Sequence, residues 1–337
     1  MDGDTRGLGS RADRGAGHPT RRLLVLGGAA AGLALLVDHG LRVETPQPPP
    51  PVPTRRPAPD EALLLSALAG LERLRRSETA VLSAREDALV RRLRTLGDEQ
   101  VRVLRGRLTN AGVPTAVIDA AVTSSPDTAP TTSPTASSIV TTTQSSPASG
   151  SGDVRTDTAL AQLMVESLRA EDWEALAAST AGTRQLLAAA YAQRLAGALL
   201  LGAALPPSPT SPVRPQLLGR TQSLLYAFEV VAAQSTGAQR RTAQATLTGL
   251  GRLEDTLTST SSTEVAGWSL PYPVTTAQAA RRLATDTLSS AVDAAAVLGR
   301  SDPSAPSLED AAHWSARLQA LAVDWNLPLT AFPGAST

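Results

Sequence analysis

The 337-residue sequence contains no cysteine and no lysine, and it has only three histidines. The absence of cysteine excludes disulfides, a thiolate nucleophile, a zinc–thiolate site and a lipidated cysteine. All 31 basic residues are arginines, and they balance 31 acidic residues. Because the formal net charge is zero, no bulk field attracts nucleic acid through counterion release. We therefore expect no nucleic-acid partner.

Aromatic residues are also scarce, at 3% of the chain, whereas alanine and leucine dominate. This composition favours closely packed helices over sheets. The length leaves room for about two helical units. The sequence therefore predicts an all-α protein with antiparallel units at Asp60–Leu201 and Val213–Trp325, either separate or packed together as one assembly.

The most apolar run lies near the N-terminus. Residues 1–22 are polar and end in Arg21-Arg22, which precede the apolar run Leu23–Val37. Arginines before such a run are typical of a secretory or twin-arginine signal, although no small-residue cleavage pattern follows. Fifteen residues span only about 22 Å as a helix, and residues up to 43 extend the segment toward the ~30 Å hydrocarbon core. An uncleaved signal-anchor, a cleaved signal and a buried soluble helix are the alternatives.

The first two alternatives place everything after Asp38 outside the cytoplasm. The protein is then a single-pass cell-membrane protein that meets the membrane through residues 23–43, or a secreted protein after cleavage. Residues 44–59 follow, with eight prolines between Pro46 and Pro59. This density predicts a polyproline II stalk.

Changes of composition divide the rest of the chain. Helical periodicity predicts a hairpin at 60–123 and further helices at 157–204, separated by a Ser/Thr/Pro-rich linker at 124–156 that we expect to be disordered. A proline-rich break around Pro206 precedes a C-terminal helical domain at 213–330. In the second helix of the hairpin the apolar stripe comprises Leu89, Leu93, Leu96, Leu104 and Leu108.

The segment Trp268-Ser-Leu-Pro-Tyr-Pro-Val274 organises the C-terminal domain. Its two prolines exclude helix there, so it separates a helical hairpin from a long helix. Thr275 with Gln278 predicts the capping box that begins this helix. Apolar residues recur at helical spacing on both sides of the segment: Leu217, Leu224, Phe228 and Val231, then Ala243, Leu247, Leu250 and Leu257, and after it Ala284, Leu288, Ala291, Ala295 and Leu298.

The last predicted helix begins at Ser307, with Asp310 as its capping-box partner. Its stripe of Trp314, Leu318, Leu321 and Trp325 is apolar. We expect the two tryptophans to pack on the three preceding helices.

Two stretches, YAFEVVAA at Tyr226–Ala233 and SLPYPVTTAQAARRLA at Ser269–Ala284, resemble a ferritin-like domain of unknown function. That family is common in secreted proteins and lipoproteins of high-GC Gram-positive bacteria. The resemblance covers Val213–Arg300 best and implies a ferritin-like antiparallel bundle, although the absence of cysteine departs from the lipoprotein members. The motif residues in this chain are Tyr226, Trp268, Leu270, Pro271, Tyr272 and Pro273.

A ferritin-like fold raises the question of a di-iron centre. That centre needs a Glu from each of two helices and a Glu-x-x-His pair from each of the other two. Only His313 lies in a predicted helix, because His18 and His39 flank the apolar run. The near-match Asp310-Ala-Ala-His313 is alone, and its Asp is explained as a cap partner. We therefore expect no standard di-iron centre and no cofactor.

Two carboxylates on or near apolar faces, Glu229 and Glu254, are the only weak metal candidates. They could face each other near Tyr226 as a cation site, or pair with arginines at the bundle rim. The arginines in question are Arg220, Arg240, Arg241 and Arg252.

Motifs of known catalytic classes are absent from the sequence, which has no Gly-x-Ser-x-Gly, phosphate loop or dinucleotide fingerprint. The favoured interpretation is a non-catalytic binding or scaffolding module of the cell envelope, with an unknown envelope protein or ligand as its partner. The alternative is a metal-dependent oxidoreductase or metal-binding protein that uses the carboxylates.

Overall fold

The protein is all-helical throughout the part that its structure, a computed structural model, describes. The described residues are 55–123, 152–258 and 268–335, and all belong to one compact unit, Arg55–Thr337. Over these ranges the chain forms ten α-helices and no strand, which confirms the predicted all-α class. The predicted polar N-terminus, apolar segment, most of the proline stalk and most of the Ser/Thr/Pro-rich linker lie outside the described residues.

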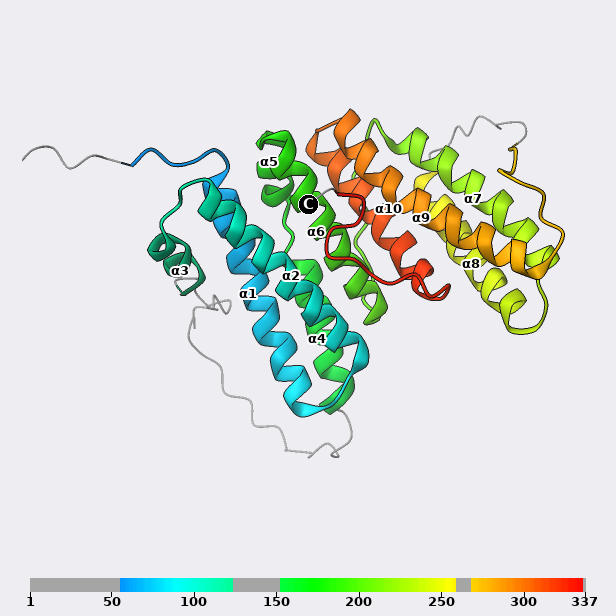
Figure 1. The fold of residues 1–337 in the computed structure, drawn as a ribbon, viewed down its shortest axis with the longest axis horizontal. Helices are drawn as coiled ribbons and strands as arrows, with labels where there is room; N and C mark the ends of the chain where they lie inside the picture. Colours follow the sequence, from blue (N-terminus) through cyan, green and yellow to red (C-terminus); the bar gives the residue numbers. More distant parts are fainter. Residues whose placement is uncertain (1–54, 124–151, 259–267, 336–337) are drawn as a thin grey trace, which may run out of the picture. The chain divides into compact units, whose positions relative to one another are not determined.

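Six helices precede the proline-rich break (Figure 1). α1 and α2 form a hairpin, with α3 packed against it, while α4 packs on both α1 and α6. α4 begins within the predicted linker rather than at Asp157. The helices are α1 (Glu61–Ala84), α2 (Ala88–Asn110), α3 (Thr115–Thr123), α4 (Gly152–Glu166), α5 (Ala170–Ala178) and α6 (Ala181–Leu200).

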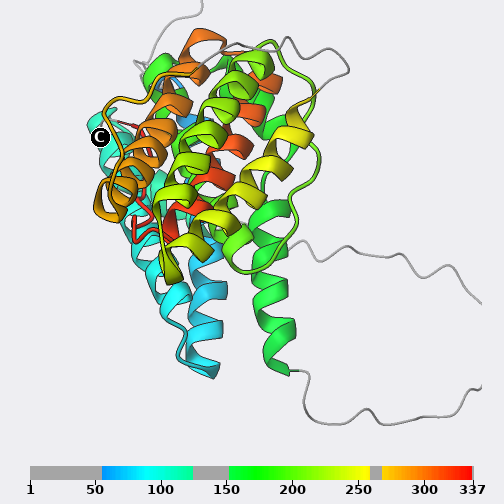
Figure 2. The same cartoon turned by 90° about the vertical axis from the view of Figure 1, so that its right-hand side faces the viewer.

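Four helices follow the break, and Figure 2 shows them side by side. They are α7 (Arg214–Gln234), α8 (Gly237–Leu257), α9 (Ala277–Ser301) and α10 (Ala305–Val323). α7 and α8 form a hairpin, α9 packs on α7, and α10 packs on α9. α10 also has an extensive contact with α6, so it joins the two groups of helices.

The apolar side chains form two buried clusters. The first core contains residues of α1 to α6, and the second core contains residues of α7 to α10. In the first core the predicted α2 stripe is buried, except that Leu89 is half-buried. α6 approaches α2 closely at Gly197, where an added Cβ would lie 2.8 Å from a methyl carbon of Leu93. A glycine at this position therefore leaves room for the Leu93 side chain against α6.

α10 contributes to both cores from opposite sides. Ala305, Leu308, Ala312 and Ala316 belong to the first core, whereas Trp314, Leu318 and Ala322 belong to the second. A helix that is apolar on all sides is typical of an interior position. The last helix is thus an internal element shared by both groups.

The tryptophans of the C-terminal segment pack on the preceding helices, as predicted. The indole Nε1 of Trp314 donates a 2.9 Å hydrogen bond to Thr221 Oγ1, and Trp325 Nε1 donates a 3.0 Å bond to Thr246 Oγ1. The Trp325 ring also meets Phe228 edge-on, with ring centroids 5.5 Å apart. Both indoles therefore bury their apolar surface while their one donor group keeps a partner.

Two predicted helix caps are wrong. α9 is capped by Thr276, whose side chain accepts a bond from the Ala279 amide, rather than by Thr275. α10 begins at Ala305, and Ser307 Oγ donates to Asp302 instead of pairing with Asp310. Adjacent Ser and Thr residues offer equivalent oxygens, so sequence spacing alone does not decide which one caps.

The segment from Trp268 to Val274 is non-helical, as its two prolines predict. Val274 is buried, and Leu270 and Tyr272 pack against the edge of the second core, whereas both prolines are exposed. The Tyr272 hydroxyl donates a 3.1 Å bond to Asp286, and the Arg282 guanidinium lies over its ring, 5.3 Å from the centroid. The segment is thus attached to α9 mainly through one partly buried aromatic side chain.

After α10 the chain returns to the first core. Leu329, Ala331 and Phe332 are buried there, and the Arg92 side chain of α2 donates a 2.8 Å bond to the Leu329 carbonyl. At Gly334 the backbone has φ +67°, and an added Cβ would lie 3.2 Å from the Asp293 backbone. Both constraints favour glycine at this position.

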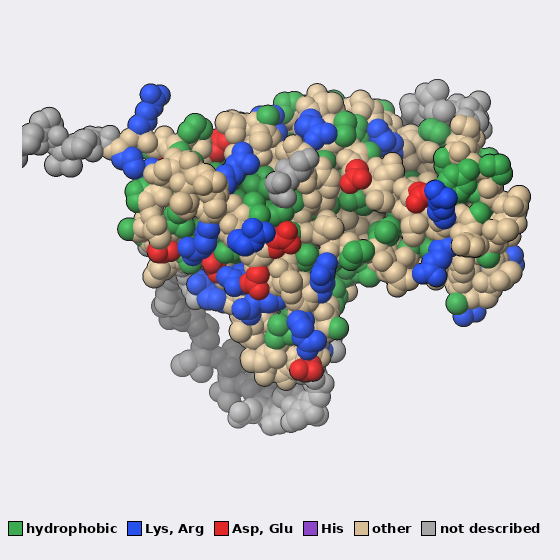
Figure 3. Space-filling view, viewed as in Figure 1, with side chains coloured by type: hydrophobic (Ala, Val, Ile, Leu, Met, Phe, Trp, Pro, Cys, Tyr) green, Lys and Arg blue, Asp and Glu red, His purple; other side chains and the backbone are tan. Residues whose placement is uncertain are grey.

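Charges of both signs are interspersed on the face shown in Figure 3, where blue and red side chains lie close together over α1 and α2. Arg105 and Asp119 form an ion pair at 2.9 Å, and Asp98 pairs with both Arg75 and Arg94. Within the described ranges no helix is both long and apolar enough to span a bilayer.

Candidate functional site

The two glutamates that the sequence singled out do not come together. Glu254 is half-buried on α8 and accepts a 3.1 Å hydrogen bond from the Gln222 side chain of α7, while Glu229 is exposed. Gln222 and Glu229 are seven residues apart, which is about 10 Å along a helix. Neither glutamate pairs with an arginine among the described residues. Tyr226 is 36% exposed, so it does not complete a buried site.

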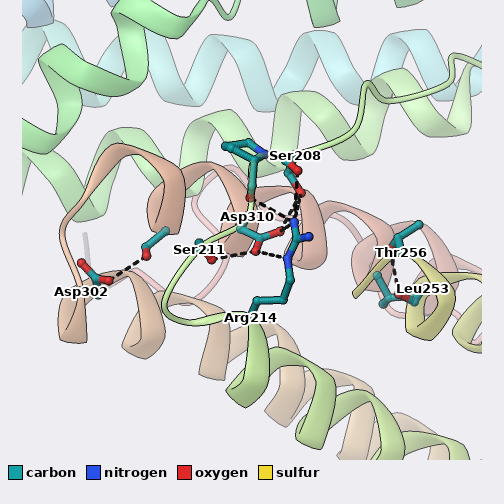
Figure 4. A network of polar contacts seen from close by, with 9 residues as sticks. Ser208, Ser211, Arg214, Leu253, Thr256, Asp302 and Asp310 are labelled. Carbon is teal, nitrogen blue, oxygen red and sulfur yellow. Dashed lines mark hydrogen bonds and ion pairs between the residues drawn. The ribbon is translucent and has the colours of Figure 1, made fainter. Parts of the chain in front are cut away.

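Asp310 instead belongs to a buried polar network between α10 and the segment before α7 (Figure 4). Its carboxylate accepts bonds from Ser208 Oγ at 2.6 Å and Ser211 Oγ at 2.7 Å. Arg214 binds both carboxylate oxygens, through Nε at 3.0 Å and Nη2 at 3.1 Å. Four donors thus satisfy a carboxylate that is 1% exposed, which is the arrangement a buried charge requires.

His313, one turn after Asp310, is buried, and among the described residues its Nδ1 atom has no hydrogen-bond partner. Burial lowers its pKa to about 4, and the charge of Arg317 lowers the pKa further against the opposing effect of Asp310. The imidazole is therefore neutral at physiological pH. Asp310 is already saturated with donors, so the near-match Asp310-x-x-His313 does not form a ligand pair.

A second polar cluster, here called the polar core, lies inside the group of α1, α2, α4 and α6. Its members are Glu78, Gln100, Gln193 and Arg194, each at most 5% exposed. Gln100 Nε2 donates to Gln193 Oε1 at 2.9 Å and to the Ala331 carbonyl at 2.7 Å. The cluster borders a cavity of about 20 Å³, which is enough for one water molecule.

Glu78 is the unusual member of the polar core, because its Oε2 atom has no hydrogen-bond partner in the described part of the chain. Burial raises its pKa to about 7, although Arg94, Arg75 and Arg194 pull the pKa down. Arg194 donates a 3.1 Å bond to Ser167 Oγ, and its guanidinium lies 5.4 Å from the Tyr191 ring centroid. Burial also raises the pKa of Tyr191 to about 12.

Sequence reasoning missed the polar core, although a signal for it was present. Leu96 and Leu104 of the α2 stripe are eight positions apart, and Gln100 occupies the missing position midway between them. Glu78 likewise lies between Leu74 and Val81 on the buried face of α1. A polar residue that replaces an apolar one in a stripe indicates a buried polar group.

A candidate ligand site, here called the alanine cavity, lies between α6, α9 and α10. It has a volume of about 310 Å³, within the range of small-molecule pockets. Fifteen residues line it, and eight are alanines: Ala181, Ala188, Ala189, Ala192, Ala295, Ala296, Ala311 and Ala312. Helix axes stay about 8–10 Å apart, and alanine side chains are too small to fill the space between three of them.

Polar groups lie only at a few points of the alanine cavity. Arg184 is half-buried, Arg300 is exposed, and Gln185 and Ser315 complete the polar lining. Ser315 Oγ accepts a 3.2 Å bond from Gln319. The chemistry of this cavity therefore suits an apolar molecule with a polar end.

The raised pKa of Glu78 predicts a pH-dependent stability. Its ordinary pKa of 4.5 rises to about 7 on folding, so the folded state holds an extra proton between these values. Stability contributed by this group is then greatest below pH 4.5 and falls as the pH rises toward 7, by about 3 kcal/mol at most. We expect Glu78→Gln to raise the free energy of unfolding at pH 8 and to change it little at pH 4.5.

The measurement is denaturant unfolding of wild type and Glu78→Gln at both pH values. His313 has the opposite sign, because its lowered pKa removes stability as the pH falls from 6.5 toward 4. Taking the difference between the two proteins cancels that effect. Equal stabilisation at both pH values would show that Glu78 is not a buried ionisable group.

The described residues contain no group of three or more His, Asp or Glu side chains that could hold a metal ion. In comparisons with known proteins, no family model, curated protein or solved structure matches this chain. The assignment of a function therefore depends on the geometry of the chain's own cavities and polar clusters.

Proposed function

We propose that this protein is a non-catalytic binding module of the cell envelope, built as a ferritin-like antiparallel helical bundle. Two observations support the ferritin-like part of the proposal. One is the sequence resemblance at Tyr226–Ala233 and Ser269–Ala284, and the other is the packing of α7, α8, α9 and α10 as four adjacent helices. No observation favours a metal-dependent oxidoreductase at Glu229 and Glu254, because these carboxylates lie apart.

The observation that carries the binding function is the alanine cavity. The apolar lining of this cavity of about 310 Å³ opens to solvent at its mouth, and apolar surface in contact with water costs free energy. An apolar ligand that fills the cavity recovers part of this free energy by restoring dispersion contacts and by burying its own surface. The cavity is therefore better explained as a place for a ligand than as a packing defect.

Decanol, a neutral molecule with a flexible alkyl chain, tests the binding function. We expect it to raise the thermal unfolding midpoint of the full chain, because a ligand that binds only the folded state stabilises it. The variant Ala188→Leu places a larger side chain in the cavity and should abolish the shift. Ala80→Leu, at an exposed position of α1 away from the cavity, is the matched control and should keep it.

A midpoint that decanol leaves unchanged in the wild type would overturn the proposal. The same conclusion follows if Ala188→Leu and Ala80→Leu respond alike, because the stabilisation would then come from another site.

Placement in the envelope is supported by Arg21-Arg22 before the apolar run Leu23–Val37. In this orientation the arginines stay inside and residues after Asp38 lie outside the cytoplasm. A reporter enzyme that is active only after export, fused after Asp60 in the native host, should be active. If the fusion to the export-dependent reporter is expressed but inactive, while a fusion to a reporter that works in the cytoplasm is active, this placement is refuted.

A further inference from the structure

The alanine cavity carries positive charge at its edge without a compensating acid. Two of its fifteen lining residues are arginines, Arg184 on α6 and Arg300 on α9, and none is Asp or Glu. Buried or half-buried cations in proteins are usually paired with anions. The cavity therefore has a net positive rim around an apolar interior.

Arg184 is held in place by groups that do not neutralise it. Its Nη2 atom donates a 2.5 Å bond to the Ser179 carbonyl, and its Nε atom donates a longer 3.4 Å bond to the Leu176 carbonyl. Both acceptors are backbone carbonyls at the C-terminal end of α5, where the helix dipole contributes only a partial negative charge. These bonds orient the guanidinium and leave its charge available to a ligand.

Arg300 lies at the last turn of α9 and is exposed. It forms no ion pair with any of the described residues. Its position at the rim allows it to reach a polar group at the mouth of the cavity while its methylenes cover apolar surface. The two arginines come from different helices, so a head group that binds both must sit at the mouth between them.

The interior sets the size of the apolar part. A cavity of about 310 Å³ lies at the lower end of the range for small-molecule sites, which suits a single alkyl chain of roughly ten carbons. The alanines that surround this space offer no hydrogen-bonding side chain. A flexible alkyl chain of about this length fits both the volume and the polarity.

We propose that the alanine cavity binds a single-chain amphiphile with an anionic head group, whose alkyl chain lies among the alanines and whose head group meets Arg184 and Arg300. This inference rests on the proposed binding function and adds the charge of the ligand. The head group is a carboxylate or a phosphate, as in a fatty acid or a single-chain lipid phosphate, because both accept hydrogen bonds from a guanidinium.

The test compares four probes with the same ten-carbon chain: decanoate, decyl phosphate, decanol and decyltrimethylammonium. Binding to the full chain is measured by calorimetry below the aggregation concentration of each probe. We expect at least one anion to bind about tenfold more tightly than decanol, and the cation to bind more weakly than decanol. The order of the two anions distinguishes a carboxylate ligand from a phosphate ligand.

Arg300→Gln removes one rim charge and should weaken the preferred anion about tenfold without changing the affinity for decanol. Arg241→Gln, an exposed arginine on α8 that does not line the cavity, is the matched control and should change neither affinity. This comparison also excludes an effect of overall net charge, because both variants lose one positive charge.

Equal affinities for the four head groups, with all binding abolished by Ala188→Leu, would overturn the anionic ligand and leave the binding function intact. Anion binding that Arg241→Gln weakens as much as Arg300→Gln would also overturn it. If no probe binds, the proposed function fails together with this inference.

Discussion

The burial of α10 on both sides is the constraint on which the rest of the described structure depends. Its alanine-rich side completes the first core, and its tryptophan side completes the second core. Asp310, on the same helix, accepts four hydrogen bonds from Ser208, Ser211 and Arg214. Because these donors lie in the segment that leads from α6 into α7, one buried carboxylate ties the connection between the two helical groups to the helix they share.

The alanine cavity follows from the same constraint. α10 must contact α6 on one side and α9 on the other, and small residues on all three helices permit this close approach. The residual space between them is apolar, and its rim carries Arg184 and Arg300.

The two buried polar clusters differ in how many of their polar atoms have hydrogen-bond partners. Asp310 has four donors, so its charge is stabilised in place. Glu78 has an oxygen without a hydrogen-bond partner in the described ranges and a pKa of about 7, and it shares its surroundings with the buried cation Arg194. The first cluster therefore stabilises one arrangement of the chain, whereas the second makes its stability respond to pH.

Local patterns in the sequence predicted much of the fold. The leucine stripe of α2, the apolar stripe that contains Trp314 and Trp325, and the absence of helix at Trp268–Val274 are all set by residues close together in the chain. The predicted helix caps were a few residues away from the observed ones, because neighbouring residues such as Thr275 and Thr276 are chemically alike. It was harder to predict which core each helix joins. The alanines of α10 that enter the first core are too weakly apolar to indicate a second buried side.

The candidate site could not be read from the sequence. Asp310 bonds to residues 96 to 102 positions away, a separation that no local motif encodes. The alanine cavity arises where three helices meet, and alanine is common along the whole chain. Glu229 and Glu254 were singled out by their spacing on single helices, but the offset of α7 against α8 keeps them apart.

Hydrogen exchange of the full chain, measured by mass spectrometry, tests most directly whether α10 couples the two cores. Peptides from α2 and α8 report on the first and second cores, and neither helix contains a member of the Asp310 network. Asp310→Ala leaves the half-buried Arg214 without its ion-pair partner and the two serine hydroxyls without their acceptor, a change that costs about 3 kcal/mol and speeds exchange roughly a hundredfold. Asp302→Ala, which removes a half-buried carboxylate that accepts bonds from the Ser304 amide and the Ser307 hydroxyl, is the control and should cost about 1 kcal/mol.

If α10 couples the two cores, Asp310→Ala accelerates hydrogen exchange of the slowest amides of α2 and of α8 by the same factor. Acceleration confined to α8, with α2 at the wild-type rate, would contradict it, because the two cores would then unfold independently.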